Sequence, residues 1–397
     1  MDNRHISFIT LPHSPHVNPT FPVVSALVRR GYRVTYATSE RFASVVQGLG
    51  AEVVPCPRLQ LEASADERNF PDAPRENFFT RYAASMLDAI RPFLERNRPD
   101  LILYDFTALA GRILASQWNI PAIQTSPFYA FDESVSFESQ MKHPELRTWI
   151  TEHAQVIAQY LKRNGVVSNN YHVDKERLNI YLFSRVLQPN SARFGANCYF
   201  AGRCAAERLV TGKWQGNSDG RPIALIAMST LSSKWPERSR VPEYFGMCMS
   251  ALPSLGWHVV LAIGEHCATE SLTPLPAHCE IVKHTSYLNV LSRAKLLCFM
   301  SGIASTTEAA YHGIPMIAIS EGVGEYEWQS DRIVELGIGA HLRKGETSME
   351  NIRGAAIQLS SDAATLHRVK KIERIVRREP GGEDTANRIE DYLDECS

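Results

Sequence analysis

The sequence predicts an α/β protein made of two doubly wound domains, each with a parallel sheet between layers of helices. Short apolar strand-like runs alternate with amphipathic helix-like stretches over the first 130 residues. The same alternation starts again after a polar, glycine-rich stretch at residues 207–222. The 397-residue chain is too long for one ordinary core and suits two domains of about 200 residues each.

In the first half, each strand-like run ends shortly before a turn or a helix-forming stretch. Gly31 and Gly50 mark the ends of two helices, because glycine readily takes the left-handed conformation that follows a helix. The expected strands are residues 5–11, 32–38, 51–56, 99–105 and 120–127, and the expected helices are residues 19–31, 39–50 and 108–119.

Residues 130–195 break this alternation. They contain a long helical stretch at 145–165 and several aromatic residues. An insertion of this kind in an α/β domain usually shapes a binding face, so we expect the stretch to form one wall of a substrate pocket, although its aromatic residues could equally belong to the core.

The second half repeats the strand and helix pattern of the first. We expect a first domain at residues 1–206, a linker at 207–221, a second domain at 222–380 and a C-terminal helix at 381–397 that packs back on the first domain. The cleft between two such domains is the expected ligand site. The expected strands are residues 223–229, 258–264, 294–300 and 314–320, and the expected helices are residues 241–256, 305–313, 327–337 and 381–395.

Charge and composition exclude several classes of function. With 42 Lys and Arg against 43 Asp and Glu, the chain has no basic excess for nucleic acid. No apolar run approaches the roughly 20 residues of a membrane span. The first strand is not followed by a GxGxxG motif, and the sequence shows no P-loop lysine, HExxH motif or carboxylate cluster with metal-ligand spacing. We therefore expect no cofactor and no metal.

The eight cysteines are scattered and form no CxxC pair. Single cysteines in a chain of this length are typical of a reduced protein. The N-terminus runs almost directly into a strand and has no signal-peptide pattern. We therefore expect a cytoplasmic protein, either a monomer or a homodimer.

Two residues at strand ends could form an acid–base pair. His16 lies in the turn after the first strand and Asp105 ends the fourth, and ligands of open α/β sheets bind at the carboxyl ends of strands. A histidine there can act as a general base, and a carboxylate can fix its tautomer. The alternative is that His16 is a plain turn residue and Asp105 a helix N-cap.

A second cluster follows the strand at 294–300. Gly302, Ser305, Thr306 and Thr307 open a helix, where backbone N–H groups and hydroxyls can bind a phosphate. Glu308 could accept hydrogen bonds from ribose hydroxyls. The alternative is ordinary helix capping, which uses the same residue types.

Long stretches of the chain resemble the bacterial macrolide-type glycosyltransferases, an inverting family that uses UDP-sugars and has the GT-B architecture. The resemblance covers nearly the whole chain except residues 130–200. The matching stretches include "LVRRGYRVTYATSERFA", "PDLILYD", "AHCEIVKHTSYLNVLSRA" and "GIASTTEAAYHGIPMIAIS".

This resemblance implies a role for the first-domain residues. The histidine that deprotonates the acceptor hydroxyl falls on His16, and the aspartate that orients it falls on Asp105. His13 and Asn18 in the same turn are expected to bind substrate. Trp328 is expected either to bind substrate or to be a packing residue.

On the donor side the sequence departs from the family pattern. His284 replaces the tryptophan that stacks on the base, Met300 replaces the histidine that binds the diphosphate, and Ser229 replaces a loop glycine. Ser286 and Tyr287 stand where the family has a proline–glutamine pair. Glu325 and Tyr326 stand where the family has an acidic–glutamine pair that binds the sugar hydroxyls. Ser301 is the small residue after Met300. Gly302, Ser305, Thr306 and Glu308 are kept.

Three functions follow from this contrast. The first is glycosyl transfer from a UDP- or TDP-sugar to a lipophilic natural product, with His16 as base. The second is acid–base chemistry on such a product without any nucleotide sugar, such as a cyclisation, elimination or isomerisation. The third is a non-catalytic partner of another enzyme.

Overall fold

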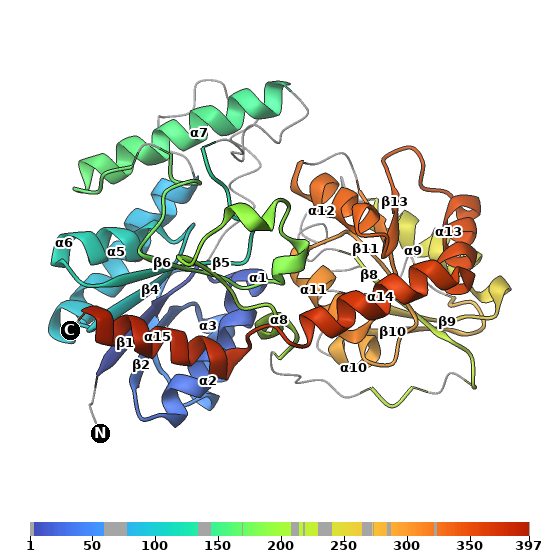
Figure 1. Ribbon diagram of the computed structural model, residues 1–397, viewed down its shortest axis with the longest axis horizontal. Helices are drawn as coiled ribbons and strands as arrows, with labels where there is room; N and C mark the ends of the chain where they lie inside the picture. The colour runs from blue at the N-terminus through green and yellow to red at the C-terminus, as the bar shows by residue number, and fades with distance from the viewer. Residues whose placement is uncertain are drawn as a thin grey trace. The chain divides into compact units, whose positions relative to one another are not determined.

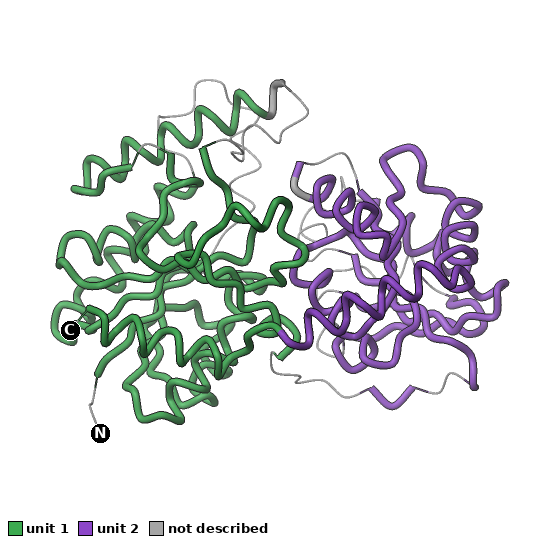
Figure 2. The backbone as a smooth tube through the Cα atoms, in the orientation of Figure 1, with its two compact units in different colours: residues 1–208, 379–397 green, residues 209–378 purple. Residues whose placement is uncertain are grey.

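The computed structural model describes residues 4–58, 78–133, 144–168, 170–207, 214–216, 219–228, 240–263, 272, 274–283, 287–320 and 324–396. The chain divides into two compact units, which are coloured separately in Figure 2: unit 1 (residues 1–208 and 379–397) and unit 2 (residues 209–378). Each unit contains one all-parallel sheet with helices on both faces (Figure 1). The domain boundaries expected at 206, 221 and 380 stay predictions.

Unit 1 is built on a seven-stranded sheet in the order β3-β2-β1-β4-β5-β6-β7. The strand order reverses between β1 and β4, which pair directly from Ile6 opposite Leu101 to Ile9 opposite Tyr104. The strands are β1 (His5–Ile9), β2 (Arg33–Thr38), β3 (Glu52–Pro55), β4 (Leu101–Asp105), β5 (Ala122–Ser126), β6 (Leu178–Tyr181) and β7 (Cys198–Phe200).

The helices of unit 1 cover the two faces of this sheet with two apolar cores. One core holds side chains of α5, α6 and α7, and the other holds side chains of α2, α3 and α15. The helices are α1 (Ser14–Val17), α2 (Phe21–Arg29), α3 (Glu40–Gly48), α5 (Phe78–Arg96), α6 (Leu109–Trp118), α7 (Pro144–Arg163), α8 (Arg203–Ala206) and α15 (Gly382–Cys396), with the 3-10 turns η1 (Asn18–Thr20), η4 (Arg185–Leu187) and η5 (Ser191–Arg193).

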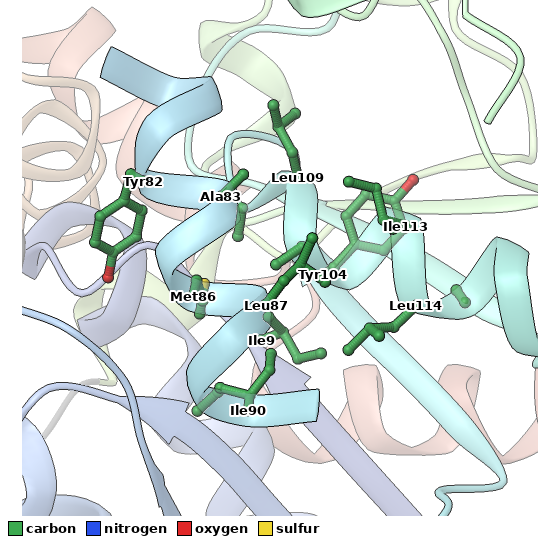
Figure 3. Close-up of a cluster of buried hydrophobic side chains, with 14 of the residues drawn as sticks. Ile9, Tyr82, Ala83, Met86, Leu87, Ile90, Tyr104, Leu109, Ile113 and Leu114 are labelled. Atoms are coloured by element: carbon green, nitrogen blue, oxygen red, sulfur yellow. The ribbon is translucent and has the colours of Figure 1, made fainter. Parts of the chain in front are cut away.

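Figure 3 shows the first of these cores. Met86 and Leu87 of α5 lie beside Tyr104 of β4 and Ile113 of α6. The tyrosine ring is fully buried, and its hydroxyl donates a hydrogen bond of 2.6 Å to Glu176. This packing fixes β4, and therefore the position at which β4 ends.

Unit 2 has a six-stranded sheet in the corresponding order, β10-β9-β8-β11-β12-β13. Its strands are β8 (Ile223–Ala227), β9 (His258–Ile263), β10 (Cys279–Lys283), β11 (Leu296–Phe299), β12 (Met316–Ile319) and β13 (Gly339–Leu342). Its helices are α9 (Val241–Ala251), α10 (Tyr287–Leu291), α11 (Ile303–His312), α12 (Gly324–Glu335), α13 (Met349–Ser361) and α14 (Ala363–Val376), with the 3-10 turn η7 (Pro253–Leu255).

The predicted fold class is confirmed, and every predicted strand is present. Gly31 and Gly50 have positive φ angles of 91° and 85° just beyond α2 and α3, as expected for helix ends. The long helix expected within residues 130–195 is α7, and the structure adds β6 within this range and β7 just after it, which extend the sheet beyond β5. Helix α7 contributes Ala154, Ile157 and Leu161 to the core, and its Tyr160 packs against that core, which supports the core alternative for this aromatic residue.

Within the described residues, the structure shows neither a membrane-spanning helix nor a cluster of metal ligands. Among the helices of this part of the chain, none combines the length and the apolar character that a membrane span requires. The histidine, cysteine and acidic side chains of the same part do not form a group of three or more that could hold a metal ion.

Candidate active site

The turn after β1 is helical. Residues 14–17 form α1, with Pro15 in its first positions, and η1 continues it directly into α2. His13 is the extended N-cap residue, and its carbonyl accepts hydrogen bonds from the N–H groups of His16 and Val17 at 2.9 and 3.0 Å. The prolines therefore begin a short helical turn that carries His16 at the carboxyl end of β1.

The turn brings His16 to Asp105, the last residue of the adjacent strand β4. Nδ1 of His16 lies 2.8 Å from Oδ2 of Asp105, whose side chain is only 1% exposed. The other carboxylate oxygen, Oδ1, accepts hydrogen bonds from the backbone N–H and the hydroxyl of Thr107 at 2.9 and 2.5 Å. The carboxylate is thus held from two sides, and a carboxylate held in this way can fix the imidazole tautomer.

The second ring nitrogen of His16 is available for chemistry. When Nδ1–H donates to Asp105, Nε2 carries a lone pair. Within the described residues Nε2 has no hydrogen-bond partner, and the side chain is 16% exposed. A neutral imidazole in this arrangement can accept a proton from a substrate hydroxyl at Nε2.

Aromatic rings line this histidine. The ring of Phe106, which directly follows Asp105, lies 6.5 Å from the His16 ring at an interplanar angle of 19°. Tyr171 continues the row at 6.5 Å and 11° from Phe106. Sequence reasoning did not single out either residue, although the position of Phe106 next to Asp105 could have indicated it. The row makes the surroundings of the proposed base apolar, with Phe106 half-buried and Tyr171 buried in the core.

A buried hydroxyl network supports the turn from β2. The hydroxyl of Tyr36 lies 2.7 Å from Oγ1 of Thr20 and accepts a hydrogen bond of 3.2 Å from Thr10, and Thr20 in turn donates to the carbonyl of Val17 at 2.7 Å. Complete burial raises the pKa of Tyr36 well above its ordinary value, so the phenol stays protonated. The network ties the end of α1 to the sheet.

The other substrate residues expected in unit 1 lie in the same turn. His13 is buried, with its ring centre 5.9 Å from that of His16. Asn18 is half-buried and begins η1. Both lie close to His16 along the chain, and their contact with substrate stays a prediction.

In unit 2 the strand β11 ends at the residues where the family pattern holds the donor phosphates. Met300 is 8% exposed and packs in the apolar core. Ser301 has a positive φ of 31°, a conformation that costs energy for a residue with a Cβ. Its hydroxyl donates to the carbonyl of Tyr326 at 3.0 Å, which helps to hold this conformation. Gly302 follows as the N-cap of α11.

Helix α11 begins at Ile303, two residues earlier than predicted. Thr306 lies in its first turns, and its hydroxyl donates to the carbonyl of Gly302 at 3.0 Å. Ser305 is half-buried and Glu308 is buried. The first N–H groups of an α-helix have no acceptor within the helix, so the start of α11 can accept an anion.

The residues expected to read the sugar belong to α12. Tyr326 is half-buried and Trp328 is buried, which favours the packing alternative for the tryptophan. Glu325 lies in the first turn of α12. Of the remaining donor residues, Tyr287 begins α10 and is buried, whereas Ser229, His284 and Ser286 lie outside the described residues.

Known proteins share this fold and much of this sequence. The chain is 31% identical to the NDP-glycosyltransferase YjiC of Bacillus subtilis strain 168 over 399 residues, which cover 99% of this chain and 98% of the relative. The chain belongs to the NDP-glycosyltransferase family. No protein-family model matches the chain.

Other glycosyltransferases agree with this assignment. The oleandomycin glycosyltransferase of Streptomyces antibioticus is 27% identical, with 98% of this chain and 91% of the relative covered. The crystal structure of CalG4, the calicheamicin glycosyltransferase, matches with a TM-score of 0.82 and 28% identity over 100% of both chains. The chain is therefore a glycosyltransferase of the GT-B fold, as the resemblance implied.

Proposed function

We propose that this glycosyltransferase transfers a sugar from a nucleoside diphosphate donor to a hydroxyl group of a lipophilic natural product, with His16 as the general base. The observation that carries the proposal is the 2.8 Å contact between His16 and Asp105 at the carboxyl ends of β1 and β4. Membership of the NDP-glycosyltransferase family supports the donor class.

The proposed reaction is a single displacement. Nε2 of His16 accepts the proton of the acceptor hydroxyl as its oxygen attacks the anomeric carbon of the sugar. The bond from that carbon to the diphosphate breaks, and the nucleoside diphosphate leaves with the electron pair. Attack opposite the leaving group inverts the anomeric centre, and Asp105 stabilises the imidazolium that forms.

The donor is assigned to the start of α11. Gly302 and the first N–H groups of the helix would bind the diphosphate, and Ser305 would add a hydroxyl. Thr306 would have to exchange its present bond to the carbonyl of Gly302 for one to phosphate. The donor is expected to be a UDP- or TDP-sugar.

The acceptor is assigned to the aromatic row beside His16. The half-buried Phe106 and the buried Tyr171 make the surroundings of His16 apolar, which suits a lipophilic molecule better than a highly charged one. Two relatives are named for natural products, the oleandomycin and calicheamicin glycosyltransferases. We propose the same broad class here.

The affinity for the nucleotide-sugar donor is expected to be low. Met300 cannot donate a hydrogen bond to phosphate, and such a bond to a charged group contributes about 1.5–3 kcal/mol. Loss of the stacking tryptophan at His284 costs roughly 1–3 kcal/mol more. Together these changes could shift donor binding from micromolar to millimolar.

Calorimetric titration with UDP- and TDP-sugars tests this function, followed by a transfer assay against a panel of hydroxylated polyketides and phenols. We expect a measurable dissociation constant for one of the donors and a glycosylated product that His16→Ala no longer forms. Absence of binding by every donor at millimolar concentration would refute the proposal.

The apolar surroundings of Met300 favour a second candidate. In it, His16 and Asp105 catalyse a proton transfer on a natural product without a nucleotide sugar. Product formation in the complete absence of nucleotide, lost on His16→Ala, would support it over glycosyl transfer. The cytoplasmic location and the oligomeric state stay predictions.

A further inference from the structure

A partly buried polar cluster lies between α12 and the last strands of unit 2. This α12 cluster consists of Ser320, Glu327, Asp331, His341 and Arg343. Ser320 follows β12, where its N–H bonds the carbonyl of Leu342 at 3.1 Å. Sequence reasoning did not identify the cluster.

His341 is the centre of the cluster, with its side chain 3% exposed. Its Nδ1 lies 3.0 Å from Oδ1 of Asp331, and its Nε2 lies 2.7 Å from the hydroxyl of Ser320. That hydroxyl also bonds Oε1 of Glu327. A continuous path of three polar contacts therefore joins Asp331 to Glu327 through the imidazole.

The path has one proton too few when the imidazole is neutral. A neutral imidazole has one N–H, the serine has one O–H, and an ionised carboxylate has none. Two protons cannot make three hydrogen bonds. A second proton on His341 completes the set: both ring nitrogens then donate, and the Ser320 hydroxyl donates to Glu327.

The charges of the cluster agree with this count. Arg343 donates to Oε2 of Glu327 at 2.8 Å and to Oδ1 of Asp331 at 2.6 Å. One guanidinium faces two carboxylates, so the described cluster has a net charge of −1 with neutral His341 and of zero with the imidazolium. Burial lowers the pKa of His341 and the positive charge of Arg343 adds to this effect, while Asp331 and Glu327 oppose it. The second proton therefore binds on acidification, below the ordinary histidine value of about 6.5.

The cluster holds the helix that carries the proposed sugar-reading residues. Glu327 and Asp331 belong to α12, which begins with residues 324–326. The carbonyl of Tyr326 also accepts hydrogen bonds from Ser301 and Ser330 at 3.0 and 2.7 Å. The first turn of α12 is thus anchored both to the end of β11 and, through the α12 cluster, to β12 and β13.

We propose that His341 is a positioning residue for donor binding, and that it fixes α12 fully only when both of its ring nitrogens are protonated. The inference rests on the proposed function, because it assigns the sugar of the donor to the start of α12. Donor affinity should therefore rise as the pH falls.

The substitution Glu327→Gln separates this role from simple support of the fold. The amide NH₂ of glutamine can donate to Ser320, whose hydroxyl then donates to Nε2 of a neutral His341, while Nδ1–H donates to Asp331. The amide oxygen can still accept from Arg343. The variant supplies the missing proton at every pH.

The experiment measures the dissociation constant of UDP-glucose and of TDP-glucose without acceptor, at about pH 5.5 and about pH 8. Wild type is expected to bind about three- to tenfold more tightly at the lower pH. Glu327→Gln is expected to bind equally at both values, near the tighter one. The matched control Glu335→Gln, which breaks the exposed pair between Glu335 and Arg332 on the same helix, should behave as wild type.

Two results would overturn the inference. One is a wild-type affinity that does not change with pH, and the other is a pH dependence that survives Glu327→Gln. If neither donor binds any of the three proteins at either pH, the proposed function fails, and the positioning role fails with it.

Discussion

Nδ1 of His16 and Oδ2 of Asp105 lie 2.8 Å apart although 89 positions separate the two residues in the sequence. Their contact follows from the topology, because β1 and β4 are neighbours and the turn after β1 begins where β4 ends. Thr107 binds the other oxygen of the same carboxylate. The orientation of the Asp105 carboxylate is therefore fixed independently of His16.

This geometry predicts the effect of Asp105→Asn. The amide oxygen would keep the two hydrogen bonds from Thr107, so the NH₂ group would face His16. Nδ1 would then accept a hydrogen bond, and the proton would move to Nε2, where the base must be free. We expect the kcat of transfer to fall about 10²–10⁴-fold with little change in the donor dissociation constant.

The matched control for this change is Thr107→Val. It removes the hydroxyl bond to Oδ1 but leaves the backbone N–H bond and the carboxylate itself. We expect a loss of about tenfold or less. Equal activity of Asp105→Asn and wild type in steady-state kinetics would show that the tautomer of His16 does not matter.

Tyr36→Phe is expected to destabilise unit 1. It leaves the buried hydroxyl of Thr10 without its acceptor and breaks the link to Thr20. The free energy of unfolding, measured by urea denaturation, should fall by about 1–3 kcal/mol.

A double variant tests whether Tyr36 and Thr20 act through one link. Combined with Thr20→Val, Tyr36→Phe should destabilise the protein less than the sum of the two single variants, because both remove the same link. Strict additivity would exclude the network.

The environment of Glu379 predicts that the free energy of unfolding depends on pH. Its carboxylate accepts a hydrogen bond of 2.9 Å from Ser184, and burial raises its pKa from 4.5 to about 7. A Cβ added to Gly202 would lie 1.8 Å from Oε2, so the carboxyl has no room to move toward that side. The folded chain therefore retains this proton to a higher pH than the unfolded chain.

Proton linkage gives the direction in which the free energy of unfolding changes with pH. Between about pH 4.5 and pH 7 the folded state binds more protons, so the contribution of Glu379 to stability falls as the pH rises and is lost above pH 7. The loss is roughly 3 kcal/mol. We expect Glu379→Gln to lose less stability than wild type between about pH 5 and pH 8. Parallel stability curves for the two proteins would contradict this.

The sequence predicted the strands that lie in the middle of each sheet but missed several at the edges. Central strands such as β4 are continuous apolar runs, which only a buried strand explains well. Strand β13, "GAHL", contains His341, and a histidine in a four-residue strand gives no apolar signal. The His341 side chain is buried where Asp331 and Ser320 contact its two ring nitrogens, and only the folded chain reveals these contacts.

The candidate site could likewise be predicted only in part from the sequence. His16 and Asp105 could be paired from the sequence because topology alone brings the carboxyl ends of adjacent parallel strands together. The roles of Thr107 and Tyr36 could not be predicted, because they depend on side-chain directions at single positions. The turn expected after the first strand proved to be helical, because Pro15 suits the first positions of a helix.

The central claim is that His16 removes the proton of the acceptor hydroxyl. The most direct test compares the kcat of glycosyl transfer and the donor dissociation constant in wild type and His16→Ala. We predict a loss in kcat of at least about 100-fold with unchanged donor binding. A His16→Ala protein that transfers sugar at the wild-type rate would contradict the account.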